Sequence, residues 1–362
     1  MGSSAYKVIT EERAPVMKIC DRTGLLCFLM KVFVGLILIV SITAIYYIIL
    51  EWDQSPNHVL SKDFPNHSVS LKQPHPATNP GIMFVQTSDE RNPSELAMCA
   101  IESAAKMNPN QIVYYFMKGF NGNFSAHREP KHKDILTLSS IKNVVIMPLN
   151  LEELFKNTRL AGWYKKVDYT QEMYWIHVLS DACRIALLWK YGGVYLDTDI
   201  ISLKPLELHN FSFICAQSKN YANGAALGFN HNHPFANMCI TDYVESYSGD
   251  IWGHQGPDLI TRMLKKWCNT DDLDMFLDKD CKGIFYLSSN WFYPVPYTDW
   301  EKYFEKGRWD KDSSAIQNEF SNTSGVHIWN FLSRSHKDPI KGSRSLLDYF
   351  FSKYCPMTYS LL

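Results

Sequence analysis

The stretch WKYGGVYLDTDI at positions 189–200 decides the fold of this 362-residue chain. Its first residues read as the end of a helix. Gly192 and Gly193 are expected to stop that helix, because glycine adopts a positive φ at little cost. Residues 194–196 are apolar and β-prone, which predicts a short strand buried on both faces. The strand runs directly into Asp197 and Asp199.

The two aspartates stand two positions apart, so in regular strand geometry both carboxylates would project to the same side at the end of the strand. Two carboxylates this close repel each other unless a cation lies between them. Oxygen ligands of this kind suit Mg²⁺ or Mn²⁺. The alternative is a turn whose two aspartates are simply solvated.

The overall composition excludes little. The net charge of −1 favours neither a nucleic-acid partner nor an acidic substrate. Aromatic residues make up 14% of the chain. Such a surplus suits proteins that stack sugars on aromatic faces, but it also suits a large core.

The N-terminal part predicts a membrane anchor. Residues 32–50 are apolar and uncharged, long enough for one transmembrane helix, and a cleaved signal peptide fits poorly because no small-residue cleavage site follows. Five basic residues precede this segment, at positions 7, 13, 18, 22 and 31, whereas Glu51 and Asp53 follow it. The positive-inside rule then predicts a cytosolic tail at 1–31 and a luminal remainder, a type II topology. The short span favours a thin membrane of the early secretory pathway, such as the Golgi apparatus.

The segment after the anchor is expected to be a stem. Residues 51–80 hold five prolines, at positions 56, 65, 74, 76 and 80, and show almost no apolar periodicity. From residue 81 the composition is globular, so residues 81–362 are expected to form one luminal catalytic domain.

Cysteines and glycosylation motifs agree with a luminal domain. Seven of the nine cysteines follow the anchor, and Cys268 and Cys281, which flank an acidic loop, are the expected disulfide. An odd number leaves at least one thiol free or paired between chains. Glycosylation sequons occur at Asn66, Asn123, Asn210 and Asn322.

Strands and helices are expected to alternate through the domain. Strands are predicted at 82–87, 112–117 and 144–149, and helices at 95–107, with Ser94 as N-cap, at 151–158 and at 172–190. This order predicts an α/β fold with a mostly parallel sheet covered on both faces. Such sheets bind ligands at the carboxyl ends of their strands, where Asp197 and Asp199 fall.

The long helix before the two glycines carries a polar face. His177, Asp181, Arg184 and Leu188 follow at helical spacing, whereas the neighbouring side chains are apolar. Asp181 and Arg184 could form only an intrahelical pair. An ionic pair within a largely buried helix, close to the two aspartates, instead suggests a polar ligand.

Several segments together resemble the α-1,4-glycosyltransferases, a family typified by lactosylceramide 4-α-galactosyltransferase and α-1,4-N-acetylglucosaminyltransferase. The motifs that carry the resemblance are SDACR at 180–184 with GGVYLDTD at 192–199, YFMKG at 115–119, IWGHQGP at 251–257, FYPVP at 292–296 and VHIWN at 326–330. The resemblance covers residues 81–362.

The resemblance implies a GT-A fold and a UDP-sugar donor, with retention of anomeric configuration. Asp197 and Asp199 would hold Mn²⁺ against the diphosphate, and a late histidine, His327, would complete the metal shell. The donor would be bound by Asp181, Arg184, Asn223 and Gly224. Candidates on the acceptor side are His254, Gln255 and Asp258. The alternative for these three is that Pro257 begins a helix there.

The predicted reaction moves galactose or N-acetylgalactosamine from its UDP-sugar to the terminal sugar of a glycosphingolipid. The alternatives are an α-1,4-N-acetylglucosaminyltransferase acting on glycoprotein glycans, a catalytically inactive relative that binds glycans, and a metal-dependent hydrolase. No motif nominates a carboxylate nucleophile for double displacement. A same-face substitution is therefore favoured, in which the departing phosphate helps to deprotonate the acceptor.

Overall fold

The computed structural model describes residues 43, 74–122, 133–206, 212–307, 313–336 and 340–362. The chain divides into two compact units, residues 1–71 and 72–362, of which the second contains nearly all the described residues. The predicted anchor at 32–50 lies outside the described residues, apart from Thr43. Within the described ranges no helix is both long and apolar enough to cross a membrane.

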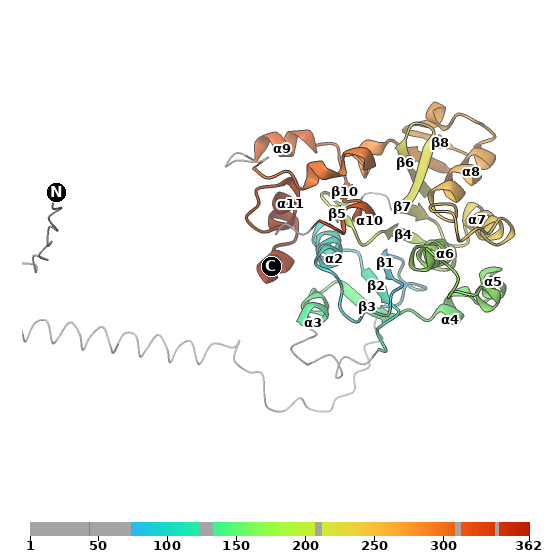
Figure 1. The fold of residues 1–362 in the computed structure, drawn as a ribbon, viewed down its shortest axis with the longest axis horizontal. Helices are drawn as coiled ribbons and strands as arrows, with labels where there is room; N and C mark the ends of the chain where they lie inside the picture. Colours follow the sequence, from blue (N-terminus) through green and yellow to red (C-terminus); the bar gives the residue numbers. More distant parts are fainter. Residues whose placement is uncertain (1–42, 44–73, 123–132, 207–211, 308–312, 337–339) are drawn as a thin grey trace, which may run out of the picture. The chain divides into compact units, whose positions relative to one another are not determined.

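An eight-stranded sheet forms the centre of the second unit, in the order β3-β2-β1-β4-β7-β6-β9-β8 (Figure 1). The strands are β1 (Ile82–Gln86), β2 (Val113–Met117), β3 (Val144–Pro148), β4 (Gly193–Leu196), β6 (Ser212–Ser218), β7 (Tyr221–Phe229), β8 (Lys279–Cys281) and β9 (Ile284–Leu287). The pairs β1–β2, β1–β4, β2–β3 and β6–β9 are parallel, and β7 and β8 run against their neighbours. The predicted α/β architecture with a mostly parallel sheet is confirmed.

Side chains that alternate along the strands enter two separate cores, one on each face of the sheet. In β1, Ile82 and Phe84 pack into one core and Met83 and Val85 into the other. The first core is covered by α2 (Glu95–Met107), α3 (Lys133–Ser139) and α11 (Leu346–Tyr354). The second is covered by α4 (Leu151–Phe155), α5 (Leu160–Lys166), α6 (Trp175–Tyr191), α7 (Pro234–Glu245) and α8 (Pro257–Cys268). Figure 1 shows α2 and α6 on opposite sides of the sheet.

Local sequence signals set the boundaries of these elements. Ser94 caps α2, because its hydroxyl accepts a hydrogen bond from the Ala97 amide at 3.2 Å. Gly192 ends α6 with φ 69°, as its sequence position predicts, and Gly193 follows with φ 101°. A Cβ at residue 193 would lie 2.4 Å from the Gly81 carbonyl oxygen, so β4 can approach β1 only with glycine there.

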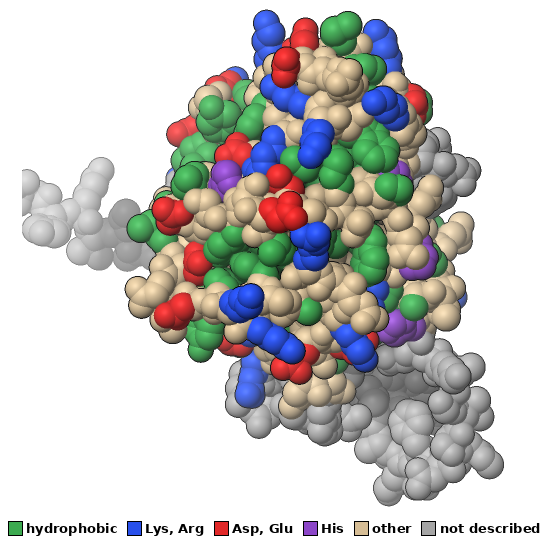
Figure 2. Space-filling model, turned by 90° about the vertical axis from the view of Figure 1, so that its right-hand side faces the viewer, with side chains coloured by type: hydrophobic (Ala, Val, Ile, Leu, Met, Phe, Trp, Pro, Cys, Tyr) green, Lys and Arg blue, Asp and Glu red, His purple; other side chains and the backbone are tan. Residues whose placement is uncertain are grey.

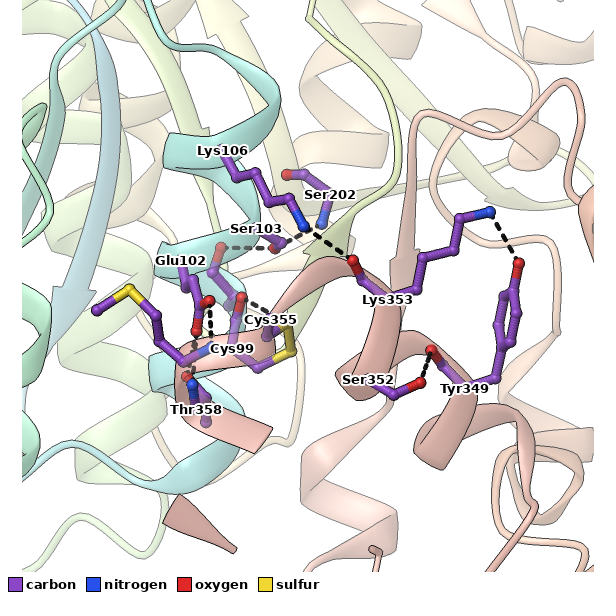
Figure 3. The surroundings of a disulfide bond; sticks show 12 residues. Cys99, Glu102, Ser103, Lys106, Ser202, Tyr349, Ser352, Lys353, Cys355 and Thr358 are labelled. Atoms are coloured by element: carbon purple, nitrogen blue, oxygen red, sulfur yellow. Dashed lines mark hydrogen bonds between the residues drawn. A yellow bond between two sulfur atoms is a disulfide. The ribbon is translucent and has the colours of Figure 1, made fainter. Parts of the chain in front are cut away.

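The C-terminal helices are fastened to α2. A disulfide joins Cys99 on α2 to Cys355, and the buried Glu102 accepts hydrogen bonds at 2.8 Å from the amides of Met357 and Thr358 in α12 (Pro356–Leu361; Figure 3). This disulfide was not predicted from the sequence. Cys268 and Cys281, which were expected to pair, form the second disulfide. Three buried cysteines, at 183, 215 and 239, are free.

Short elements complete the unit around this sheet. They are the two-stranded antiparallel pair of β5 (Ile200–Ser202) and β10 (Gly325–His327), the helices α9 (Ser314–Glu319) and α10 (Asn330–Ser333), and the 3-10 helices η5 (Leu273–Phe276), η6 (Ser289–Trp291) and η7 (Tyr297–Tyr303). On the face that Figure 2 shows, acidic and basic side chains intermingle with apolar ones.

Candidate active site

Asp197 and Asp199 lie in the turn between β4 and β5, which corrects the expectation of two carboxylates along one regular strand. The strand ends at Leu196, and the Ile200 amide closes the turn by donating to the Asp197 carbonyl at 3.0 Å. The two carboxylates therefore have different partners: Asp197 contacts Arg184 and Asp199 contacts His327.

Pairing between β5 and β10 brings His327 to the aspartates. Ile200 lies opposite His327 in this antiparallel pair, and the Ile328 amide donates to the Asp199 carbonyl at 2.9 Å. His327 Nε2 then lies 3.2 Å from Asp199 Oδ1. One ligand atom each from Asp197, Asp199 and His327 lies within 4.8 Å of the others. The structure thus assembles the three residues expected to bind a metal.

The donor set fits a divalent cation. Asp199 and His327 are 8% and 7% exposed, so neither side chain is extensively hydrated. His327 Nδ1 is buried without a hydrogen-bond partner among the described residues, which leaves Nε2 as the atom aimed at the carboxylates. Carboxylate oxygens with an imidazole nitrogen suit Mn²⁺ and similar ions.

Arg184 places a positive charge next to the cluster. Its Nη2 lies 3.1 Å from Asp181 Oδ1 and 3.2 Å from Asp197 Oδ1, so it joins helix α6 to the β4–β5 turn. The Asp181 side chain is 11% exposed and that of Arg184 is 8% exposed. The pair is more than an exposed intrahelical contact, because Arg184 also carries a contact outside its own helix.

The pKa values of Asp181 and Asp199 are shifted in opposite directions by burial and by neighbouring charges. Burial raises the pKa of Asp181 to about 7, although the Arg184 guanidinium opposes the change. Burial also acts to raise the pKa of Asp199, but His327 and the Asn330 amide outweigh it and hold this pKa below its usual value. Asp199 is therefore held as a carboxylate.

These residues face a cavity of about 1130 Å³. It is lined by residues from the ends of β1 and β4, from α6 and α10, and from the loop before α8. The lining includes Gln86, Thr87, His177, Asp181, Arg184, Asp197, Asp199, Asn223, Trp252, His327, Asn330 and Phe331. The cavity is large enough for a ligand well above the size of a single sugar.

Asn223 and Gly224 have different roles at the cavity. Asn223 lines the cavity, and its Oδ1 accepts from the Ala225 amide at 2.8 Å. A Cβ at position 224 would lie 2.9 Å from Arg184 Nη1. Gly224 therefore makes room for Arg184, whereas the sequence suggested close approach to the donor itself.

The three acceptor-side candidates are not brought together in the cavity. Gln255 is 1% exposed, its amide nitrogen donates to the Tyr243 carbonyl at 2.8 Å, and its oxygen accepts from the Ser248 amide. His254 Nε2 lies 2.9 Å from the Ser246 carbonyl. Asp258, in the first turn of α8, accepts from the Tyr221 hydroxyl, and Tyr221 rather than Asp258 lines the cavity. In the structure these residues support the loop before α8, which begins at Pro257.

Two contacts to the aspartates were missed in the sequence. The Tyr195 hydroxyl donates to Asp197 Oδ1 at 2.6 Å, and the Asn330 amide donates to Asp199 Oδ2 at 2.8 Å. Tyr195 stands two residues before Asp197, so strand spacing could have indicated it. The Asn330 contact depends on a backbone amide distant in the chain, which no sequence pattern reveals.

Two family models match most of the domain. Residues 94–219 match the glycosyltransferase sugar-binding region containing the DXD motif, and residues 228–362 match the alpha 1,4-glycosyltransferase conserved region. The D-x-D turn, the cluster of Asp197, Asp199 and His327, and the α/β sheet behind them thus define a glycosyltransferase of the DXD class.

Curated relatives narrow the class to a family. The chain is 40% identical over 337 residues to lactosylceramide 4-alpha-galactosyltransferase of Rattus norvegicus, covering 91% of this chain and 90% of the relative. It is 38% identical over 279 residues to alpha-1,4-N-acetylglucosaminyltransferase of Homo sapiens, covering 77% and 79%. The chain belongs to the α-1,4-glycosyltransferase family. A solved structure of the galactosyltransferase LgtC with donor and acceptor sugar analogues is also similar, with TM-score 0.38, 12% identity, and coverage of 77% of this chain and 95% of that one.

Proposed function

We propose that this enzyme is a retaining α-1,4-glycosyltransferase that moves galactose or N-acetylgalactosamine from a UDP-sugar to the terminal sugar of a glycosphingolipid. The single observation that carries the proposed sugar transfer from a nucleotide donor is the cluster of Asp197, Asp199 and His327 in the wall of the 1130 Å³ cavity. The glycolipid acceptor is supported by the 40% identity to a lactosylceramide 4-alpha-galactosyltransferase over most of both chains.

The proposed fold is GT-A, with the donor at the carboxyl ends of β1 and β4. Asp197, Asp199 and His327 would hold Mn²⁺, which supplies positive charge for the diphosphate leaving group. Arg184 and the Tyr195 hydroxyl both contact the Asp197 carboxylate and hold it in place. Asp181, Arg184 and Asn223 line the cavity and are the proposed donor contacts.

The proposed chemistry is a same-face substitution at the anomeric carbon of the donor. The bond from that carbon to the phosphate oxygen breaks while the acceptor hydroxyl oxygen bonds to the same face. The hydroxyl proton passes to an oxygen of the departing phosphate, so UDP leaves with the electron pair. The chain's own residues orient these groups. They supply no nucleophile in this scheme, because Asp181 and Asp197 are already engaged by Arg184.

Transfer of N-acetylglucosamine to glycoprotein glycans is the second candidate. It is favoured by the 38% identity to alpha-1,4-N-acetylglucosaminyltransferase. An inactive glycan-binding relative is disfavoured, because Asp197, Asp199 and Arg184 are all retained and assembled. A two-metal hydrolase is disfavoured because such sites need more His and carboxylate ligands than the motifs supply.

The test is a donor panel with one glycolipid. The full chain, purified in detergent, is incubated with Mn²⁺, lactosylceramide and UDP-galactose, UDP-N-acetylgalactosamine or UDP-N-acetylglucosamine, and the product linkage is read by NMR. We expect an α-1,4-linked galactose or N-acetylgalactosamine product, with UDP release that requires the acceptor. The same donor panel is run in parallel with a glycoprotein glycan as acceptor, and preferential transfer of N-acetylglucosamine to that glycan would support the second candidate.

The proposed setting is the Golgi membrane, with a type II anchor at 32–50, a stem at 51–80 and a luminal catalytic domain at 81–362. Support comes from the charge asymmetry around the apolar segment and from the two disulfides, which are typical of oxidising compartments.

A further inference from the structure

An aromatic stack lies at the cavity, beside the residues assigned to the metal. Trp252, from the loop between α7 and α8, and Phe331, on α10, lie with ring centroids 3.9 Å apart and planes at 20°. Both residues line the cavity together with Asp197 and Asp199. Trp252 nevertheless keeps 44% of its surface exposed. A large indole so exposed, at the wall of a cavity, is available to a ligand.

Several contacts hold this stack rigid. The His177 ring meets Trp252 at 4.8 Å and Phe331 at 5.1 Å, edge to face in both cases. Tyr174 contacts the indole at 5.2 Å, and the Arg334 guanidinium lies 4.2 Å from the centre of the Phe331 ring. Aromatic pairs of these geometries contribute beyond their buried area. The indole is therefore preorganised and loses little conformational freedom when a ligand binds.

The stack is joined to the metal-binding cluster through the backbone. Phe331 directly follows Asn330, whose amide donates to Asp199 Oδ2 at 2.8 Å. His177 lies on the same face of α6 as Asp181 and Arg184, next to both the stack and the charged groups. The cavity therefore has a charged end, which suits a diphosphate, and an adjacent aromatic wall without formal charge at Trp252.

We propose that Trp252, supported by Phe331, is the platform on which the terminal sugar of the acceptor lies. This inference rests on the proposed transferase function. A pyranose ring has an apolar C–H face and a polar rim, so it matches an exposed indole bordered by polar side chains. A nucleoside diphosphate needs charge neutralisation, which the aspartate and arginine end of the cavity provides.

The test separates acceptor binding from donor binding. In the full chain in detergent, Trp252→Ala is compared with Trp252→Phe, which keeps an aromatic face, and with Met275→Ala, an exposed apolar residue outside the cavity lining. With lactosylceramide and with free lactose as acceptors, we expect Trp252→Ala to raise the acceptor KM about tenfold. The donor KM should remain within about twofold, Trp252→Phe should recover most of the acceptor affinity, and Met275→Ala should match the wild type.

The results that overturn the inference are distinct from a failure of the proposed function. An unchanged acceptor KM in a turning-over Trp252→Ala enzyme rejects the platform, and so does an equal rise in donor KM, which would mean a purely structural stack. A defect seen with lactosylceramide but absent with lactose would assign Trp252 to the lipid instead.

If no donor supports turnover, the proposed function fails. Saturation-transfer NMR of lactose binding to wild type and Trp252→Ala then decides the platform, and equal binding rejects it.

Discussion

Arg184 determines the local geometry of the site at the scale of single residues. Its guanidinium contacts Asp181 within its own helix and Asp197 across the cavity wall, and Gly224 gives it the space to do so. A planar guanidinium can contact two carboxylates at once, which a lysine ammonium does poorly. Leaving the buried Asp181 carboxylate unpaired would be costly, because a broken buried ion pair destabilises a fold by about 3–5 kcal/mol.

Gly224→Ala tests the packing of Arg184. The new Cβ would lie 2.9 Å from Nη1, so the guanidinium must shift from the position in which it contacts Asp181 and Asp197. We expect turnover to fall about tenfold or more and unfolding free energy to fall by about 1–3 kcal/mol, the usual cost of overpacking. The matched control is Gly162→Ala in α5, where no described atom beyond its chain neighbours and its own helix backbone lies within 4 Å of the added Cβ. Wild-type turnover in Gly224→Ala would show that Arg184 is not constrained there.

Asp181 predicts a specific pH dependence of stability. Its pKa is raised to about 7 in the folded protein, so between its ordinary pKa of 3.8 and about 7 the folded state binds more protons than the unfolded state. The contribution of Asp181 to stability is therefore greatest at low pH and is lost as the pH rises towards 7. Asp181→Asn should remove this trend. Urea unfolding of residues 72–362 at about pH 5 and pH 7 measures the change in unfolding free energy with pH. If the unfolding free energies of the variant and the wild type change with pH to the same extent, the prediction is wrong.

At the scale of secondary-structure elements, local signals in the sequence predict the fold well. Helix α2 occupies 95–107 as predicted, with Ser94 as its cap, and the strands at 82–87, 112–117 and 144–149 differ from the observed ones by one residue at an end. These elements have a strong apolar pattern and clear end signals. The predicted helix at 172–190 starts later, at Trp175, because residues before it form turns.

What the sequence does not reveal depends on pairings distant in the chain. Strands β5 and β10 have three residues each, too few for a periodic pattern, yet their pairing brings His327 to Asp199. His327 was reached only through family resemblance. The Trp252–Phe331 stack likewise joins the loop before α8 to helix α10, and no local signal connects the two. The predicted strand at 194–196 ends at Leu196 as expected, but the sequence does not show that Asp197 and Asp199 lie in a turn and not in a continued strand.

The two disulfides should differ in their effect on stability. Cys99–Cys355 spans 256 residues and fastens the C-terminal helices to α2, whereas Cys268–Cys281 spans 13. Loop-closure entropy grows with loop length, so we expect the Cys99→Ser and Cys355→Ser double variant to lose about 5–6 kcal/mol and the Cys268→Ser and Cys281→Ser double variant about 3 kcal/mol. Urea unfolding of both variants measures the order, and the opposite order would contradict the entropic argument.

At the scale of the whole molecule, the topology can be tested through glycosylation. Asn322 is exposed between α9 and β10, so an oligosaccharyltransferase can reach it in a luminal domain. The sequons at Asn66, Asn123 and Asn210 lie outside the described residues. We expect Asn322→Gln to remove one glycan from the full chain made in cells, seen as a mobility shift that enzymatic deglycosylation abolishes. A chain without any glycan, with its domain open to protease from the cytosol, would contradict the type II topology.

The most direct test of the central claim is the metal dependence of sugar transfer in Asp199→Asn. This change keeps the side-chain shape but removes the charge that His327 and the Asn330 amide hold in place. We expect wild-type transfer from a UDP-sugar to a glycolipid to require Mn²⁺ and to be lost in EDTA. Asp199→Asn should lower turnover a few hundred-fold or more, equivalent to about 3–4 kcal/mol, while the exposed Asp271→Asn control behaves as wild type. A folded Asp199→Asn enzyme with near wild-type turnover in EDTA would contradict the account.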